Sequence, residues 1–275
     1  MTNPEFLEKA YGTTDLLTIR IRAQERYGIN PHDLFDSMTQ WALGRSQPTS
    51  VLDVGMGTGK WYQSLRRLAG PKIQYRGIDA ALAMVTEMSE RTVHDDYAAI
   101  TLGDAQMLPY EDDQFDWVGL HFMLYHVPNP EQALQEAWRV VRPGGLIITL
   151  AHGQDTLENL WALHQEAVQH CLKRSIQSDP QPSYTLDNGA VLFNSPNQVF
   201  QVRYPSGLRF PNTEAALAYY ASGFWQRGLQ TKEWEDPAIL SCLLGHVENA
   251  INRHIAQHGT FDIPGTTGWL WAIKS

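Results

Sequence analysis

The sequence has few cysteines, few basic residues and no long apolar run. Its two cysteines, Cys171 and Cys242, lie far apart and form no CxxC pair, which predicts free thiols in a reducing compartment. The 21 Lys and Arg face 30 Asp and Glu, and the resulting charge of −9 disfavours a protein that binds nucleic acid through its phosphates. No apolar stretch nears the roughly 18 residues of a membrane span, and the first residues show no secretory signal. We therefore expect a cytoplasmic protein that binds neither nucleic acid nor membrane.

The composition is that of a folded globular chain. Hydrophobic residues make up 43% and charged residues 19% of the 275 positions, which allows a sizeable core. At about 150 residues per domain, the length fits one large domain or two small ones. We expect a single domain, 1–275, with a helical N-terminal cover (1–50), an α/β core (51–153) and a region of helical insertions and further strands (154–275).

Residues 51–153 alternate short apolar runs with helical patterns. The runs predict strands at 51–54, 73–78, 98–102, 115–122 and 146–150, and the patterns predict helices at 60–69, about 80–91 and 130–141. Strands that alternate with helices through short turns favour βαβ units and a parallel sheet covered on both faces. The less regular remainder predicts helices at 156–174, 213–222 and 237–257, and strands at 200–210 and 269–273.

Three alternate glycines, Gly55, Gly57 and Gly59, follow the first strand and precede a helix. Glycine is needed where a chain turns tightly or where a ligand approaches the backbone closely. The spacing is GxGxG, and Lys60 stands where a dinucleotide-binding fingerprint would have its third glycine. A glycine-rich turn without any ligand is the alternative interpretation.

Two acidic residues follow the next two strands. Asp79 comes about 20 residues after Gly59, where nucleoside-binding α/β folds place an acid against the ribose hydroxyls. Asp104 follows the third strand, where a carboxylate can accept the adenine amine while Met107 packs on the ring. Each acid also has a plainer interpretation, as a helix cap for Asp79 and as an ordinary loop residue for Asp104. Because the carboxyl ends of parallel strands share one edge, the combination favours a ligand that contains a nucleoside.

These segments resemble the class I S-adenosylmethionine-dependent methyltransferases, specifically the small-molecule group similar to ubiquinone/menaquinone-type methyltransferases. The matching segments are Val51–Gly59, Gly77–Asp79, Gly103–Ala105, Leu108–Tyr110, Phe115–Val118, Leu124–Asn129 and Arg139–Gly145. The resemblance implies a Rossmann-like α/β fold, with a seven-stranded sheet of order 3-2-1-4-5-7-6 whose last strand is antiparallel. It also implies S-adenosyl-L-methionine as the cofactor, and methyl transfer to an O, N or C atom of a small organic acceptor.

The resemblance further assigns residues to the parts of the cofactor. The assignments are Asp53, Gly55, Gly57 and Gly59 to the methionine part, Asp79 to the ribose, and Asp104, Ala105 and Met107 to the adenine. His121 is expected beside the sulfonium. Arg20, in an N-terminal helical segment, is expected to pair with the cofactor carboxylate, unless it lies on a solvated helix face. Met56 departs from the family, which often has a small residue or Cys there, so its side chain must point away from the cofactor or pack on it.

Methyl transfer from a sulfonium requires alignment and exclusion of water more than covalent catalysis, since the leaving group is already good. A base helps only where the acceptor is protonated. His121 and His126 are the candidate bases, and a structural role for each is the alternative. No metal site is expected, because the histidines at 246, 254 and 258 lack an adjoining acidic ligand. The aromatic residues between 219 and 234 are expected to form either a helical core or an acceptor-binding lid.

Two other functions stay open. An NAD(P)-dependent oxidoreductase would use a related fold, although position 60 is not glycine and the sequence has no Tyr-x-x-x-Lys motif. A non-catalytic protein that retains S-adenosylmethionine binding as a regulatory or scaffold module would show the same motifs. We expect a monomer or homodimer whose partner is a small-molecule substrate.

Overall fold

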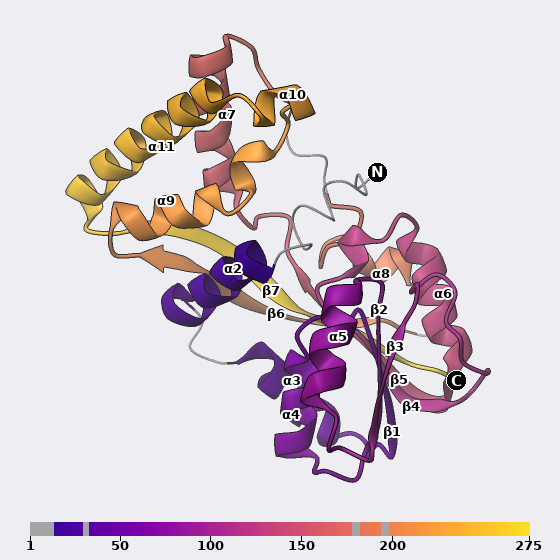
Figure 1. Cartoon of the computed structure of the whole chain (residues 1–275). Helices are drawn as coiled ribbons and strands as arrows, with labels where there is room; N and C mark the ends of the chain where they lie inside the picture. Colours follow the sequence, from indigo (N-terminus) through magenta and orange to yellow (C-terminus); the bar gives the residue numbers. More distant parts are fainter. Residues whose placement is uncertain (1–13, 30–32, 178–181, 194–197) are drawn as a thin grey trace.

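The computed structural model describes residues 14–29, 33–177, 182–193 and 198–275. Its centre is a seven-stranded sheet of order β3-β2-β1-β4-β5-β7-β6, with helices on both faces (Figure 1). The strands are β1 (Ser50–Val54), β2 (Gln74–Asp79), β3 (Ala98–Leu102), β4 (Phe115–Leu120), β5 (Val141–His152), β6 (Phe200–Phe210) and β7 (Phe261–Ile273). The expected α/β class and strand order are confirmed.

The direction of the strands also agrees with the prediction. β3, β2, β1, β4 and β5 run parallel, whereas β7 is antiparallel to both β5 and β6. Two strands are longer than the sequence predicted, because β5 begins at Val141 and β7 at Phe261. β7 pairs with β6 along the whole of β6, and this ladder runs through Pro264 and Gly265, residue types that gave no strand signal.

The helices of the α/β core lie close to their predicted positions. They are α4 (Lys60–Leu68), α5 (Leu82–Arg91) and α6 (Pro130–Val140), preceded by α2 (Thr14–Tyr27) and α3 (Leu34–Leu43). The later helices are α7 (Glu158–Leu172), α8 (Gly189–Leu192), α9 (Thr213–Ala221), α10 (Thr231–Trp234) and α11 (Pro237–His258), with short 3-10 helices η1 (Leu124–His126) and η2 (Phe224–Gln226). Side-chain caps begin several of them: the Asn129 side chain accepts the Gln132 N–H at 3.1 Å at the start of α6.

Two apolar cores cover the two faces of the sheet. On one face, Leu52 and Val118 of the sheet pack with Leu134 of α6. On the other face, Met38 of α3 and Trp61 of α4 are buried against the strands. Because both faces are covered, a ligand reaches the sheet at its carboxyl edge, where the loops after β1, β2, β3 and β4 lie.

A third apolar core lies away from the centre of the sheet, at the far ends of β6 and β7. There α7, α9, α10 and α11 form a helical cap (Figure 1). Val168, Tyr220 and Val247 of the cap pack with Leu208 and Ile263 of the two strands. The long β6–β7 ladder therefore joins the cap to the sheet.

The expectation of free thiols was wrong. Cys171 of α7 and Cys242 of α11 form a disulfide, with their Cα atoms 6.0 Å apart. The two helices pack side by side in the helical cap, and this contact between distant segments cannot be read from the spacing of the cysteines along the sequence. Within the described ranges, no helix has the length and apolar character needed to cross a membrane.

Candidate active site

The loop after β1 has a backbone that only glycine adopts easily. Gly55, Gly57 and Gly59 have φ angles of +67°, +52° and +73°. A Cβ at Gly55 would lie 2.8 Å from the side chain of Met123, and one at Gly59 would collide with Met88. A Cβ at Gly57 would meet nothing within 4 Å. Gly55 and Gly59 are therefore required by packing, whereas the space over Gly57 is open to a ligand.

Asp79, at the end of β2, holds the glycine loop in place. Its Oδ2 accepts the Gly57 N–H and its Oδ1 accepts the Ala81 N–H, each at 2.9 Å. Burial raises the pKa of Asp79, although these backbone hydrogen bonds act in the opposite direction. A carboxylate offers about four lone pairs, which leaves room for a ribose hydroxyl beside the backbone N–H groups. The helix-cap and ribose interpretations are compatible in this geometry.

Asp53, on β1, is buried and is hydrogen-bonded to a neighbouring strand. The Tyr75 hydroxyl of β2 donates to its Oδ2 at 2.7 Å. The pKa of Asp53 is raised to about 7, mainly by burial; the Tyr75 hydrogen bond opposes this increase and the charge of Asp79 adds to it. Asp53 therefore supports the strand that leads into the glycine loop. Its predicted contact with the cofactor stays a prediction.

The unusual Met56 causes no obstruction in the loop. Its side chain is buried in the core against α3 and α4, and its sulfur lies over Gly77, where a Cβ would collide with it. Of the two expected arrangements, the side chain thus takes the one that points away from the ligand edge.

The loop after β3 presents a carboxylate beside an apolar surface. Asp104 is exposed, and its oxygens accept the N–H and the side-chain amide of Gln106 at 2.9–3.1 Å. Met107, Leu102 and Leu82 are 77%, 53% and 65% exposed. Large apolar side chains exposed at one sheet edge suit a planar ring, as the adenine assignment requires.

Ala105, by contrast, is buried in the core on the α6 face of the sheet. Any contact of Ala105 with the cofactor would thus involve its backbone, and that contact stays a prediction.

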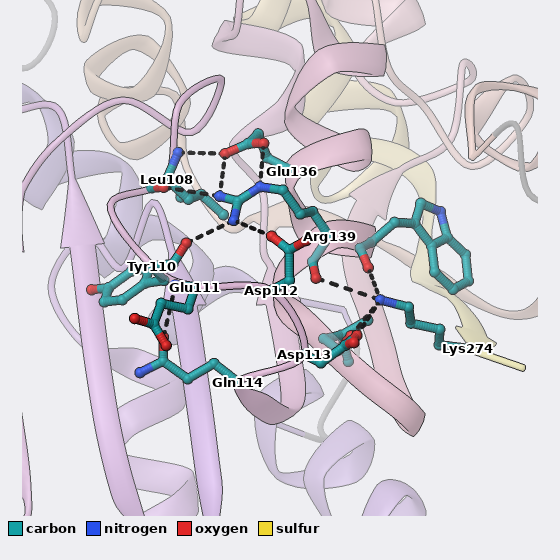
Figure 2. Close-up of polar contacts among 11 residues, drawn as sticks. Leu108, Tyr110, Glu111, Asp112, Asp113, Gln114, Glu136, Arg139 and Lys274 are labelled. Carbon is teal, nitrogen blue, oxygen red and sulfur yellow. Dashed lines mark hydrogen bonds and ion pairs between the residues drawn. The ribbon is translucent and has the colours of Figure 1, made fainter.

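Arg139 of α6 holds the loop after β3 through hydrogen bonds and ion pairs (Figure 2). The Arg139 guanidinium donates to the Tyr110 carbonyl at 2.7 Å and to the Leu108 carbonyl at 3.0 Å, and it forms ion pairs with Glu136 and Asp112. Glu136 in turn accepts the Leu108 N–H at 2.7 Å. Arg139 and Glu136 together therefore hold the loop at Leu108, Tyr110 and Asp112.

His121, directly after β4, lies among aromatic rings. Its ring contacts Trp61 in an edge arrangement with centroids 4.4 Å apart, and Phe35 at 5.6 Å. Its Nδ1 accepts the Leu150 N–H at 3.3 Å, which places the proton of the neutral ring on Nε2. Burial lowers the pKa of His121 to about 3. This geometry favours a structural role for His121, and its predicted catalytic role stays untested.

His126, in η1, is half-buried and lies close to positive charge. Its pKa is lowered to about 4, mainly by burial and also by the guanidinium groups of Arg20 and Arg227. α2 thus brings Arg20 near the loop after β4. The pairing of Arg20 with a cofactor carboxylate stays a prediction, as does a catalytic role for His126.

The aromatic residues of the helical cap are mainly core residues. Tyr219, Tyr220, Phe224 and Trp225 are all buried, and the Tyr220 hydroxyl is hydrogen-bonded to His164 at 2.7 Å. This packing favours the helical-core interpretation, while the lid hypothesis stays untested. In the part of the chain that is described, no three His, Cys, Asp or Glu side chains gather as metal ligands would.

Sequence reasoning missed several residues that shape the site. Tyr75, Met123 and Gln106 support Asp53, the glycine loop and Asp104, but each looks like an ordinary strand or loop residue in the sequence. His152, at the end of β5, was also missed. Its position after an apolar run could have drawn attention to it, because residues that end parallel strands lie at the ligand edge.

The sequence and structure of this chain are similar to those of known methyltransferases. Residues 52–149 match the family described as "Methyltransferase domain". A demethylmenaquinone methyltransferase of Staphylococcus aureus is 35% identical over 136 residues, which are 48% of this chain and 56% of that protein. The chain thus matches only about half the length of such curated relatives.

Solved structures extend the similarity of the fold beyond the matched residues. The YcgJ protein of Bacillus subtilis has a TM-score of 0.58 at 17% identity, covering 88% of this chain and 99% of that one. A phosphoethanolamine N-methyltransferase of Haemonchus contortus, in complex with S-adenosylhomocysteine, has a TM-score of 0.57 at 18% identity, covering 98% of this chain and 59% of that one. Residues 52–149 thus match a methyltransferase domain, and the sheet has the strand order that the resemblance to class I S-adenosylmethionine-dependent methyltransferases implied.

Proposed function

We propose that this protein transfers the methyl group of S-adenosylmethionine to a small organic acceptor. The observation that carries the proposal is the open space over Gly57, directly beside the Asp79 carboxylate. A ligand with ribose hydroxyls next to a flexible chain fits this arrangement, and the exposed Met107 suits an adenine ring. When bound, S-adenosylmethionine supplies an electrophilic methyl group on a sulfonium.

The residues of the chain contribute mainly binding and alignment. Asp79 accepts hydrogen bonds from the ribose, Gly57 leaves room for the methionine part, and Arg20 balances a carboxylate. Holding the acceptor in line with the S–CH₃ bond can lower the barrier by roughly 7–11 kcal/mol. The loop after β4, α2 and α3 exclude water from that space.

A base is required only for an acceptor that carries a proton at the reacting atom. His126 is the better of the two candidate bases, because it is half-buried, and the low pKa leaves its ring neutral at pH 7. His121 would have to give up its hydrogen bond from Leu150 before Nδ1 could accept a proton. We propose His126 for an acceptor contact and His121 for support of the β4 loop.

The name of a relative suggests which acceptor class to test first. The Staphylococcus aureus relative is named for demethylmenaquinone, so a reduced naphthoquinone is the first acceptor to test. The family match ends at residue 149 and so does not describe the helical cap. We therefore propose a small organic acceptor and leave the atom that is methylated open.

Calorimetry with S-adenosylhomocysteine and with NADH separates the proposal from its rivals. We expect S-adenosylhomocysteine to bind one site and NADH not to bind. Transfer of a tritiated methyl group to a reduced short-chain demethylmenaquinone then tests the activity, with Asp79→Ala as the inactive control. Binding of NADH alone would indicate an oxidoreductase, and cofactor binding without transfer to any of a panel of small acceptors would indicate a regulatory module.

The cellular location, the lack of nucleic acid partners and the oligomeric state of the protein stay predictions. The predicted cytoplasmic location depended partly on free thiols, and the disulfide between Cys171 and Cys242 removes that support. The predicted lack of nucleic acid partners rests on the charge of −9. A monomer or homodimer stays the prediction for the oligomeric state.

A further inference from the structure

His152 is a half-buried polar side chain at the carboxyl edge that has no part in the cofactor assignments. It is the last residue of β5, and it pairs with Thr267 of β7, which pairs in turn with Tyr204 of β6. Residues in register on neighbouring strands project from the same face of a sheet. His152, Thr267 and Tyr204 therefore form a row across three strands, on the face that α3 and α4 cover.

The position of this row suits the methyl acceptor better than the cofactor. The glycine loop follows β1, and β4 lies between β1 and β5. Neighbouring strands are about 4.8 Å apart, so the end of β5 lies roughly 10 Å from the end of β1. That spacing separates two ligands placed side by side along one edge.

The ring of Phe122 packs on the imidazole of His152, whereas no hydrogen bond from the described residues reaches its Nδ1. Phe122 lies against it, with ring centroids 4.7 Å apart and planes tilted by 33°. Its Nδ1 is buried and has no hydrogen-bond partner among the described residues. The Nε2 of His121 is also buried without such a partner, but the N–H of Leu150 fixes the tautomer of that ring. A ligand would therefore decide which nitrogen of His152 carries the proton.

The backbone at Phe122 also indicates a functional constraint. Phe122 has a φ of +53°, a left-handed conformation that costs a bulky residue about 1–2 kcal/mol. Its N–H donates to the Leu150 carbonyl at 2.8 Å, which keeps the turn in place. Strained backbone of this kind is found at binding and catalytic sites, and here it positions the Phe122 ring that packs on His152.

On the basis of the proposed function, we propose that His152 binds the methyl acceptor, through a hydrogen bond between its imidazole and a hydroxyl or N–H group of that molecule. Burial lowers the pKa of His152 to about 4, against a smaller opposite effect of Asp155. The ring is therefore neutral at pH 7 and can either accept or donate. Because the apolar ring of Phe122 packs on it, the imidazole is a polar anchor beside an apolar surface, which orients the acceptor and rejects analogues that lack the polar group.

Chemical labelling tests whether the imidazole can be reached from the acceptor side. Diethyl pyrocarbonate acylates neutral imidazole rings that a small molecule can reach, and mass spectrometry locates the modified histidine. In the complex with S-adenosylhomocysteine, we expect labelling of His152 and of the exposed His94, but not of the buried His121. An unlabelled His152 beside a labelled His94 would overturn the proposal, and this result needs no knowledge of the acceptor.

Kinetics then test the hydrogen bond itself. His152→Phe keeps a ring of similar size and removes the hydrogen bond, and His152→Gln restores one polar group. With the reduced demethylmenaquinone probe, we expect His152→Phe to raise KM at least tenfold, His152→Gln to recover part of the loss, and the surface control His94→Phe to change nothing. The Kd of S-adenosylhomocysteine should be the same in all four proteins. Equal KM values would overturn the proposal, whereas failure of the unaltered protein to bind S-adenosylhomocysteine would refute the proposed function instead.

Discussion

The geometry of the glycine loop leads to a sharp prediction for Gly57→Ala. At φ +52° an alanine costs about 1–2 kcal/mol of strain, while the loss of backbone freedom in the unfolded chain returns about 0.4–1 kcal/mol. No atom lies within 4 Å of the new Cβ, so packing adds no cost. The net loss of folding free energy should be about 1 kcal/mol, which lowers the Tm of a chain this long by roughly 2–4 °C.

The effect on ligand binding should be much larger than the effect on folding. The new methyl group would occupy the space assigned to the methionine part of the cofactor. We expect the Kd of S-adenosylhomocysteine to rise at least tenfold, which corresponds to about 1.4 kcal/mol.

Gly144 provides a matched control on the opposite edge of the sheet. It lies in the amino-terminal part of β5, has a φ of +77°, and its added Cβ would also meet nothing within 4 Å. Gly144→Ala should lower Tm by a similar amount and leave the Kd unchanged. Thermal unfolding and calorimetry of the two variants check this difference. If both variants bind S-adenosylhomocysteine as the unaltered protein does, the open space over Gly57 is not the cofactor site.

Four further predictions concern Asp79, Arg139, Asp53 and the disulfide of the helical cap. Asp79→Asn should weaken S-adenosylhomocysteine binding at least tenfold in calorimetry while the protein stays folded by circular dichroism, and unchanged affinity would remove Asp79 from the ribose site. Arg139→Gln should cost about 1–2 kcal/mol in urea unfolding and weaken cofactor binding, since hydrogen bonds to a charged group stabilise by about 1.5–3 kcal/mol and this one is partly exposed. Because the pKa of Asp53 is raised to about 7, its ionisation destabilises the folded state, and the free energy of unfolding should fall by up to about 1.4 kcal/mol per pH unit as pH rises from 4 to 7. Asp53→Asn should flatten this slope in urea unfolding. An identical slope in the variant would contradict the raised pKa of Asp53. Replacing Cys171 and Cys242 by serine should lower stability by about 4 kcal/mol, the value for a closed loop of this length, and a loss near zero would mean that packing alone holds the helical cap.

The α/β core could be predicted from the sequence because local and distant signals agree there. The end of β1 is marked by an apolar run that stops at Val54 and by the glycines after it, and the end of β2 is marked by Asp79. Parallel strands must bring those ends to one edge. The strand order came from the resemblance and is confirmed. Met56 shows the limit of such reasoning, since only the packing against Gly77 decides which way its side chain points.

Other features depend on contacts that no local pattern encodes. β7 extends through Pro264 and Gly265 because β6 lies beside it, and the disulfide forms because α7 and α11 pack together. The surroundings of His121 are also a tertiary property, set by Trp61 of another element. The candidate catalytic residues were therefore the least predictable part of the site, because catalysis depends on the accessibility of a nitrogen atom and not on the presence of a histidine.

A crystal structure of the protein with S-adenosylhomocysteine tests the proposed cofactor site directly. We expect the homocysteine part over Gly57, the ribose hydroxyls hydrogen-bonded to the Asp79 carboxylate, and the adenine beside Asp104 and Met107. The sulfur should face the space between the loop after β4 and the end of β5, with His152 on the far side of that space. Ligand density at any other place, with no ligand over Gly57, would show that the cofactor does not bind at the glycine loop.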